Sequence, residues 1–265
     1  MSKNILKIKF YKYHGNGNDF IMIDNLNGTC DELSKTDVKL LCDRNFGIGS
    51  DGLILICKSE NLDFEMKFFN PDASSSFCGN GARCAVAFAQ FLGINNQQFK
   101  FSAFDGTHEA FLSDKKITIS IQDVQEVKEI NGDVFVLNTG SPHYISYDSS
   151  LLDDFVEQAR KIRHSASFLP EGINVNVVSE IDKETLKIKT FERGVENETL
   201  ACGTGIVASA LSYLYKNNIH GNSSIHVISA GGELLVQTDY SKNKGFENIY
   251  LTGNAELIFE GVFDV

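Results

Sequence analysis

Two cysteines open similar glycine-rich motifs, Cys-Gly-Asn-Gly at residues 78–81 and Cys-Gly-Thr-Gly at residues 202–205. Each motif precedes an apolar segment, at 86–92 and 206–215, a pattern typical of a loop that leads into a helix. The first turn of a helix exposes backbone N–H groups, which bind anions and lower the pKa of a nearby thiol. Either motif alone would fit a tight turn with a buried cysteine. Their repetition favours two reactive thiols, each beside an anion site.

Two such thiols could together invert a carbon centre. If two similar domains presented the motifs across a shared cleft, a carbon between them would have one sulfur on each face. One thiolate would remove a proton while the opposite thiol donated one. A free thiol has a pKa of about 8.5, already near the working pH that favours proton transfer. The glycine N–H groups could hold an α-carboxylate and stabilise the charge that develops on deprotonation.

The spacing of weaker motifs indicates that the chain is a duplication. Cys202 follows Cys78 by 124 positions (202 − 78). Residues 17–21 are echoed from residue 140 at an offset of 123 (140 − 17), and residues 47–51 from residue 172 at an offset of 125 (172 − 47). Internal similarity in one order at nearly one offset predicts two copies of one domain. We expect the first domain at 1–122 with a C-terminal return at 254–265, and the second at 123–253.

The elements that must position the motifs follow the same order in both halves. In the first half we expect a helix at 31–44, capped at Ser34 or Thr36, and strands at 5–13, 20–24, 53–57, 64–69, 99–104, 107–112 and 117–121. In the second half we expect a helix at 151–163 and strands at 134–138, 173–179, 186–191, 225–229, 233–238 and 249–259. Each half therefore predicts a sheet packed with the helix that follows its cysteine motif.

The composition limits the partners and the compartment. The chain has 265 residues and a net charge of −11 with no basic run, so nucleic acid is not an expected partner. No apolar stretch reaches the length of about 20 residues that a membrane span needs, and the first ten residues do not form a secretory signal. We therefore expect a cytoplasmic protein with six reduced cysteines. A homodimer is compatible with the sequence.

Metal and cofactor sites are not expected. The cysteines form no C-x-x-C pair and the six histidines are not paired at ligand spacing, so the sequence favours no metal site. No lysine occurs in the motifs, and a Schiff-base cofactor is therefore not expected. Cys30, Cys42, Cys57 and Cys84 stand among apolar neighbours or at a loop and are interpreted as structural.

Five motifs carry a resemblance to a known family. They are Gly-x-Gly-Asn-Asp-Phe (15–20), Gly-Ile-Gly-x-Asp-Gly-Leu (47–53), Cys-Gly-Asn-Gly-Ala-Arg-Cys (78–84), Ser-Pro-His (141–143) and Glu-Arg-Gly…Glu-Thr-x-Ala-Cys-Gly-Thr-Gly (192–205). Together they resemble the diaminopimelate epimerases over almost the whole chain. The resemblance implies an α/β (α+β) fold of two homologous domains, each a mixed sheet wrapped round a central helix, with the active site in the cleft between them. It also implies an isomerase that interconverts LL- and meso-diaminopimelate in lysine biosynthesis without a cofactor.

The resemblance also implies roles for individual residues. Cys78 and Cys202 match the two catalytic bases of the family. The substrate-binding positions are Asn18, Asn70, Asn174, Glu192 and Arg193, with Gly79, Asn80, Gly203 and Thr204 at the carboxylate-binding helix starts. His143 and Glu192 match groups that support the thiols.

The chemistry of diaminopimelate agrees with these roles, because the molecule has two carboxylates and two ammonium groups. Arg193 suits bidentate capture of the distal carboxylate, and asparagine amides can accept from an ammonium and donate to a carboxylate. Structural interpretations stay open for single residues: Arg193 as a solvated surface pair, Asn70 before a proline as a turn former, and His143 as a satisfied core histidine.

The chain departs from the common family pattern at three places. The loop at 70–78 is one residue shorter, with Ala73 where glycine is usual. Ser141 replaces an asparagine before Pro-His, and Gly52 stands where some members have glutamine. These departures concern the substrate contacts and leave the two thiols unchanged.

Three other functions compete with the epimerase hypothesis. A proline or hydroxyproline racemase-like enzyme would also use two thiols, but its substrate has no distal amino-acid head for Arg193, Asn70 and Asn174. A thiol redox protein would close a disulfide between Cys78 and Cys202, although reversible dithiol chemistry normally uses C-x-x-C. A catalytically silent binding module of the same fold would not need the intact thiol pair.

Overall fold

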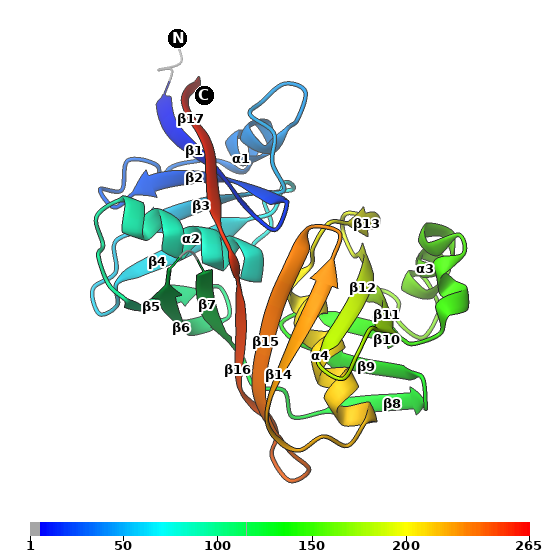
Figure 1. Cartoon of the computed structure of the whole chain (residues 1–265). Helices are drawn as coiled ribbons and strands as arrows, with labels where there is room; N and C mark the ends of the chain where they lie inside the picture. The colour runs from blue at the N-terminus through cyan, green and yellow to red at the C-terminus, as the bar shows by residue number, and fades with distance from the viewer. Residues whose placement is uncertain (1–5, 115) are drawn as a thin grey trace. The chain divides into compact units, whose positions relative to one another are not determined.

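The computed structural model describes residues 6–114 and 116–265, and its chain divides into two compact units (Figure 1). The first unit comprises Met1–Ile119 and Gly253–Val265, and the second comprises Ser120–Thr252. Residue 5, the first residue of the strand predicted at 5–13, lies outside the described residues. No helix in the described ranges combines the length and the apolar character needed to cross a membrane.

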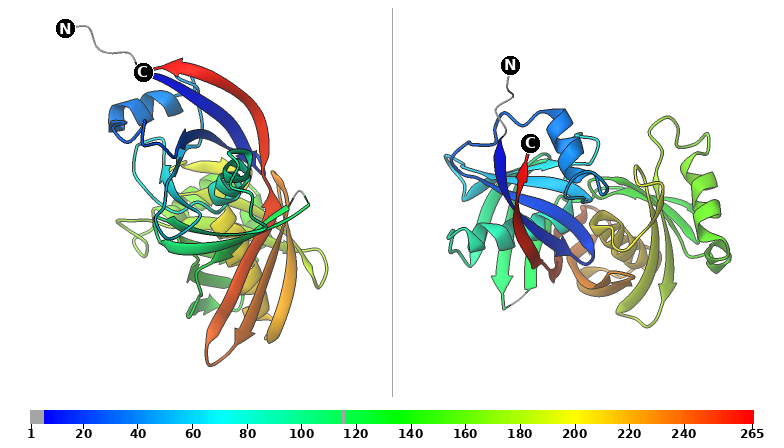
Figure 2. Two further views of the ribbon diagram at one scale, coloured as in Figure 1. Left: turned by 90° about the vertical axis from the view of Figure 1, so that its left-hand side faces the viewer. Right: turned by 90° about the horizontal axis from the view of Figure 1, so that it is seen from above.

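The first unit is a mixed sheet built around a buried helix. Its elements are β1 (Lys7–Gly15), β2 (Asn18–Asn25), α1 (Lys35–Cys42), β3 (Gly52–Cys57), β4 (Phe64–Phe69), α2 (Gly79–Phe91), β5 (Gln98–Ala103), β6 (Gly106–Ser113), β7 (Lys116–Ile121) and β17 (Glu256–Asp264). Pairing runs β17-β1-β2-β3-β4-β5-β6-β7. The β2–β3 and β4–β5 pairs are parallel and the others antiparallel. The first and last strands, β1 and β17, therefore run side by side in opposite directions (Figures 1 and 2).

The second unit repeats this plan. Its elements are β8 (Val127–Asn131), β9 (Val134–Asn138), β10 (Pro142–Ser146), the 3-10 helix η1 (Ser149–Leu152), α3 (Phe155–Arg163), β11 (Asn174–Glu180), β12 (Thr185–Glu192), β13 (Asn197–Thr199), α4 (Gly203–Lys216), β14 (Gly221–Ser229), β15 (Gly232–Ser241) and β16 (Gly245–Asn254). Pairing runs β8-β9-β10-β11-β12-β14-β15-β16, with parallel β10–β11 and β12–β14 pairs, and β13 pairs with β12.

The two units share one topology. In each, two parallel strands flank a surface helix (β2-α1-β3 and β10-α3-β11), and a second parallel pair flanks the cysteine-motif helix (β4-α2-β5 and β12-α4-β14). The motif helices are buried almost all round, which agrees with their many small and apolar residues. The predicted α/β fold of two domains, each a mixed sheet with a central helix, is confirmed.

Several predicted boundaries were wrong for local reasons. The helix predicted at 31–44 is limited to α1, because Ser34 forms a capping box with Asp37 and fixes the start. The helix predicted at 151–163 is interrupted, because Asp154 has a left-handed backbone (φ 52°) between η1 and α3. The strand predicted at 249–259 is two strands, β16 and β17.

Three short strands of the second unit, β8, β10 and β13, were not predicted. β10 begins at Pro142, a position that a strand tolerates because the first residue need not donate to the ladder. β8 and β13 are mostly exposed and therefore have no apolar alternation to reveal them.

Candidate active site

Cysteine is the N-cap residue of both motif helices. Cys78 precedes α2 with φ −135° and ψ 111°, and Cys202 precedes α4 with φ −112° and ψ 108°. In both cases the backbone of the cap residue is extended. The thiol therefore lies at the helix end where the first-turn N–H groups have no carbonyl partner within the helix. Gly81 N donates to Cys78 Sγ over 3.4 Å, so the sulfur already uses the anion-binding property of its helix start.

The neighbouring helix-start residues occupy the positions that the sequence predicts. Gly79 and Asn80 are the first two residues of α2, and Gly203 and Thr204 are the first two residues of α4. All four residues are buried. Their backbone N–H groups belong to the turn that attracts negative charge.

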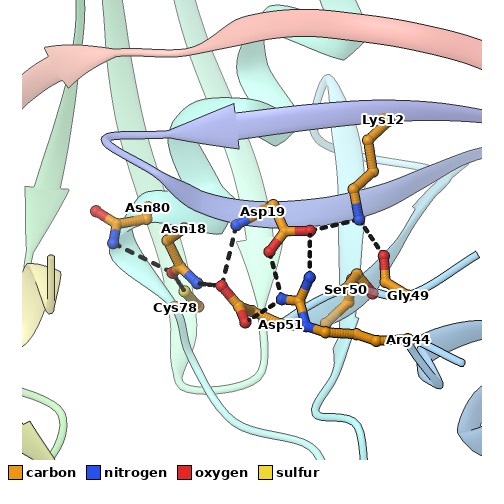
Figure 3. A network of polar contacts seen from close by, with 10 residues as sticks. Lys12, Asn18, Asp19, Arg44, Gly49, Ser50, Asp51, Cys78 and Asn80 are labelled. Carbon is orange, nitrogen blue, oxygen red and sulfur yellow. Dashed lines mark hydrogen bonds and ion pairs between the residues drawn. The ribbon is translucent and has the colours of Figure 1, made fainter. Parts of the chain in front are cut away.

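Asn18 connects Cys78 to a charged network at the start of β2 (Figure 3). Cys78 Sγ donates to Asn18 Oδ1 over 3.8 Å, and Asn80 Nδ2 donates to the same oxygen over 3.2 Å. Asn18 Nδ2 donates to Asp51 Oδ2 over 2.7 Å. The structure therefore brings Asn18, Asn80 and Cys78 together, as the sequence predicts for three substrate-site residues.

Asp51 belongs to a cluster of two carboxylates and two cations. Arg44 binds Asp19 at 2.6 Å and Asp51 at 2.7 Å, while the buried Lys12 binds Asp19 at 2.5 Å and the carbonyl of Gly49. Burial would raise the pKa of Asp19, but hydrogen bonds from Arg44 and Lys12 outweigh it and lower that pKa below its ordinary value. The Asp19 hydrogen bond raises the pKa of Arg44. The cluster thus stays charged and anchors the turn that carries Asn18.

Asn70 is turned toward its own loop. Its Nδ2 lies 3.0 Å from Ser74 Oγ and 3.2 Å from Ser76 Oγ, and its backbone N donates to the carbonyl of Ser74 over 2.8 Å. Ala73 in this loop has φ 67°, the left-handed region that glycine occupies more easily. This conformation explains why relatives use glycine there, and the buried methyl of Ala73 packs into the core of the first unit.

Gly52 has a packing explanation. A Cβ atom at this position would lie 2.4 Å from Cε2 of Phe68, so the ring fills the space that a longer side chain would need. Ser141, the other departure, accepts from Asn174 Nδ2 over 2.9 Å. Both departures are therefore accommodated within their own units.

In the second unit a buried histidine leads to the second thiol. His143 Nε2 lies 2.9 Å from Thr204 Oγ1, and Thr204 Oγ1 lies 3.5 Å from Cys202 Sγ. On the other side of the ring, Asn176 Nδ2 lies 3.1 Å from His143 Nδ1. The chain Asn176–His143–Thr204–Cys202 connects a core amide to the sulfur, which agrees with a supporting role for His143.

Burial keeps His143 neutral. Burial, the largest cause, and the charge of Arg193 together lower the pKa of His143 to about 3. Asn176 Oδ1 accepts from Thr190 Oγ1 over 3.2 Å, so its nitrogen is assigned toward the ring. The neutral ring then carries its hydrogen on Nε2 and donates it to Thr204 Oγ1. The Thr204 hydroxyl hydrogen is thereby directed at Cys202.

Asn174 links this chain to the predicted distal-carboxylate residue. Its Oδ1 accepts from the backbone N of Arg193 over 2.8 Å, and its Nδ2 donates to Ser141 and to the carbonyl of Pro142 over 3.1 Å. The Arg193 guanidinium is half-buried and lies 3.5 Å from the carbonyl of Glu171. Glu192 Oε2 accepts from Thr199 Oγ1 over 3.1 Å. Asn174 therefore fixes the backbone of Arg193. The side chains of Arg193 and Glu192 contact Glu171 and Thr199 of the second unit.

Five residues of these networks escaped sequence reasoning as site residues: Lys12, Asp19, Arg44, Asp51 and Asn176. Each stands inside or beside a motif that the sequence analysis used. Their role depends on donor and acceptor geometry across strands, which spacing does not reveal. Within residues 6–114 and 116–265, no group of three or more His, Cys, Asp or Glu side chains is arranged to hold a metal ion.

The two-domain α/β fold is shared with other solved structures. The chain superimposes on a PhzF-family protein from Bacillus anthracis with a TM-score of 0.75 at 13% identity, covering 98% of this chain and 99% of the other. It superimposes on a hydroxyproline epimerase from Agrobacterium vitis with a TM-score of 0.72 at 11% identity, covering 98% and 93%. At these identities the likeness concerns the fold alone.

Sequence comparison then gives the family. A model of the family described as diaminopimelate epimerase matches residues 10–127 and 135–258. A diaminopimelate epimerase from Flavobacterium psychrophilum is 41% identical over 256 residues, covering 96% of this chain and 99% of the relative. One from Chlorobaculum tepidum is 38% identical, covering 93% and 98%. The chain belongs to the diaminopimelate epimerase family, which confirms the resemblance drawn from its motifs.

Proposed function

We propose that this protein is an isomerase that interconverts LL- and meso-diaminopimelate in lysine biosynthesis, using two thiols as acid and base. The observation that carries the proposal is the pair of cysteine N-caps, Cys78 and Cys202, on the equivalent buried helices of two domains with one topology. The family match over nearly the whole chain supports the choice of substrate.

In this reaction one sulfur removes the α-proton as a thiolate and the other donates a proton to the opposite face of the same carbon. The first-turn N–H groups at Gly79, Asn80, Gly203 and Thr204 would hold the α-carboxylate and stabilise the charge that develops there. Preorganised donors of this kind lower the barrier because they need not reorient during the proton transfer.

The distal amino-acid head would be recognised by polar side chains of both domains. Arg193 can bind the distal carboxylate with two parallel hydrogen bonds. Asn18 presents an amide oxygen that suits an ammonium group, and Asn174 fixes the backbone of Arg193. Asn70 would have to exchange a contact with Ser74 or Ser76 for one with substrate.

His143 and Glu192 would support the reaction from the second domain. His143 is neutral and reaches Cys202 through the Thr204 hydroxyl, so it orients a donor toward that sulfur. Glu192 would accept from a substrate ammonium, as a half-buried carboxylate can.

The test is proton NMR of LL-diaminopimelate in deuterated water with reductant and chelator present and no cofactor added. We expect the signal of one α-proton to disappear while the meso isomer forms. Cys78→Ser and Cys202→Ser should each abolish epimerisation while the proteins remain folded. Cys30→Ser, a control in the apolar core of the first unit, should retain it.

Other outcomes would redirect the proposal. Exchange with proline or hydroxyproline instead of diaminopimelate would keep the two-thiol chemistry and replace the substrate. No exchange with any amino acid, together with a readily formed disulfide between Cys78 and Cys202, would favour the redox function. Full activity in either serine variant would refute the assignment of both cysteines.

Three further proposals concern the setting of the enzyme. We propose a cytoplasmic location, supported by the buried thiols of Cys30, Cys42, Cys57 and Cys84. We propose domain limits at 1–122 with 254–265 and at 123–253. We also propose a homodimer, supported by β17, whose side chains Leu257, Ile258, Phe259 and Val262 are 45–63% exposed. Sedimentation of the protein and of a Phe259→Lys variant tests the dimer.

A further inference from the structure

The orientation of the Asn18 amide is fixed by Asp51, whose carboxylate oxygen accepts a hydrogen bond from it. Asp51 Oδ2 accepts from Asn18 Nδ2 over 2.7 Å and from the backbone N of Asp19 over 3.1 Å (Figure 3). A backbone N–H can only donate, so Asp51 Oδ2 is an acceptor, and Arg44 donates to the other oxygen, Oδ1, over 2.7 Å. The nitrogen of Asn18 must therefore face Asp51, and its oxygen faces the other way.

The opposite end of the amide is fixed independently through Asn80. Arg83 is fully buried on α2 and its NH2 atom donates to Asn80 Oδ1 over 2.8 Å and to Asn16 Oδ1 over 2.9 Å. A guanidinium cannot accept, so the Asn80 oxygen must face Arg83 and its nitrogen must face Asn18. That nitrogen donates to Asn18 Oδ1 over 3.2 Å. The accepting carboxylate of Asp51 and the donating guanidinium of Arg83 therefore impose the same orientation on the Asn18 amide.

The fixed oxygen lies against the sulfur of Cys78. The separation is 3.8 Å, within reach of an S–H donor, and an amide oxygen offers no hydrogen to a thiolate. We propose that Arg83 and Asn80 are positioning residues for the reaction: they hold the Asn18 oxygen against Cys78 and so keep this cysteine as the protonated thiol in the free enzyme. The proposal rests on the two-thiol reaction proposed above and adds which sulfur carries the proton at rest.

The second unit has the opposite arrangement. Cys202 Sγ lies 3.5 Å from the Thr204 hydroxyl, and a hydroxyl can donate to a thiolate. His143 Nε2 on the far side of Thr204 orients that hydroxyl toward the sulfur. Both helices begin at a cysteine N-cap, although only Cys78 Sγ accepts a capping bond, from Gly81 N over 3.4 Å. In the proposal it is the side chains that distinguish an acid position from a base position.

The hydrogen bonds from Arg83 through Asn80 and Asn18 to Cys78 are called the relay below. The charged groups around Cys78 act separately from it. They are Asp51 and Asp19 with Arg44 and Lys12 at the start of β2, and Arg83 on α2; burial raises the pKa of neighbouring Cys84, so it is uncharged. Burial lowers the pKa of Arg83 only to about 10, so it remains a cation that attracts a Cys78 thiolate. Direct attraction by Arg83 therefore opposes the relay, and a test must keep this charge.

Asn80→Leu meets that condition, because it removes the relay and leaves every charge in place. The experiment measures the rate of iodoacetamide alkylation of Cys78 against pH, in a Cys202→Ser background, by peptide mass spectrometry. We expect the midpoint to fall by about one pH unit, hence roughly tenfold faster alkylation below the midpoint, because Asn18 loses the Asn80 contact that helps to hold its oxygen against the sulfur. Asn18→Ala, at a half-buried position, should lower the midpoint in the same direction.

Two internal controls accompany the measurement. Cys84 is fully buried in α2, and its continued lack of reaction shows that the helix remains folded. Cys202, measured in a Cys78→Ser background, should keep its midpoint in the Asn80→Leu protein.

The outcomes are distinct from those of the substrate test, since no substrate is present. An unchanged or raised midpoint for Cys78 in both variants would overturn the relay, whatever the enzyme epimerises. A shifted midpoint in a protein that fails to act on diaminopimelate would keep the relay and reject the substrate.

Discussion

The fourth residue of each cysteine motif offers a matched perturbation, because Gly81 and Gly205 occupy the same position in the two copies. A Cβ at Gly205 would lie 2.7 Å from Asn176 Oδ1 and 3.2 Å from His143 Cε1. A Cβ at Gly81 would lie 3.0 Å from Ile54 Cδ1, the end of an aliphatic side chain that can move. The same substitution therefore meets a buried polar network in one domain and a movable methyl in the other.

The expected free energies follow from these contacts. Replacing a helical glycine by alanine stabilises a helix by about 1 kcal/mol. At Gly81 this gain offsets a small repacking cost, so Gly81→Ala should change the free energy of unfolding by less than about 1 kcal/mol. At Gly205 the methyl must displace Asn176 from His143; overpacking costs about 1–3 kcal/mol and unpaired buried polar groups about 1–3 kcal/mol. The net loss for Gly205→Ala should be about 2–4 kcal/mol.

Urea unfolding followed by tyrosine fluorescence measures both values, and epimerase assays show the effect on the reaction. Gly205→Ala should lose most of its activity because His143 no longer orients Thr204. Equal destabilisation by the two substitutions would refute the reasoning, and so would a larger loss at Gly81.

Three further predictions follow from the structure. The pKa of His143 is lowered to about 3 in the folded protein. As the pH falls below about 6.5, the unfolded chain therefore binds a proton at His143 that the folded chain does not bind. This contribution to the free energy of unfolding is fully present above that pH and is lost toward pH 3. Between pH 7 and pH 5.5 the free energy of unfolding of the native protein, measured in urea, should fall by about 1 kcal/mol more than that of a His143→Asn variant. The same fall in both proteins would contradict the lowered pKa. Ala73→Val should destabilise by about 2 kcal/mol or more because a β-branched residue resists a φ of 67°, whereas Ala73→Gly should stay within about 1 kcal/mol; thermal unfolding compares the two. Arg193→Lys should lower kcat/KM for diaminopimelate about tenfold or more by losing bidentate binding, while Arg160→Lys, an exposed ion-pair control, should leave it unchanged in steady-state assays.

The duplication was predictable because backbone requirements leave a mark on sequence. A helix start beside a ligand needs small residues, so the Cys-Gly-x-Gly motifs recur at one offset in both copies. The buried strands are apolar runs, and β3, β4 and β11 begin within about a residue of their predicted limits. Exposed strands such as β8 have no such mark, and their pairing is decided by neighbours distant in sequence.

The sequence by itself determined the family, the two-domain α/β fold and the two cysteine motifs, because all three depend on residue types at fixed local spacing. Only the tertiary structure decided what surrounds each sulfur. Arg83, Asp51 and Asn176 act through hydrogen bonds to Asn16, Asn18 and His143, which come from other strands or loops. The sense of each bond depends on which atom faces which. Residue order along the chain does not specify that orientation, and packing does.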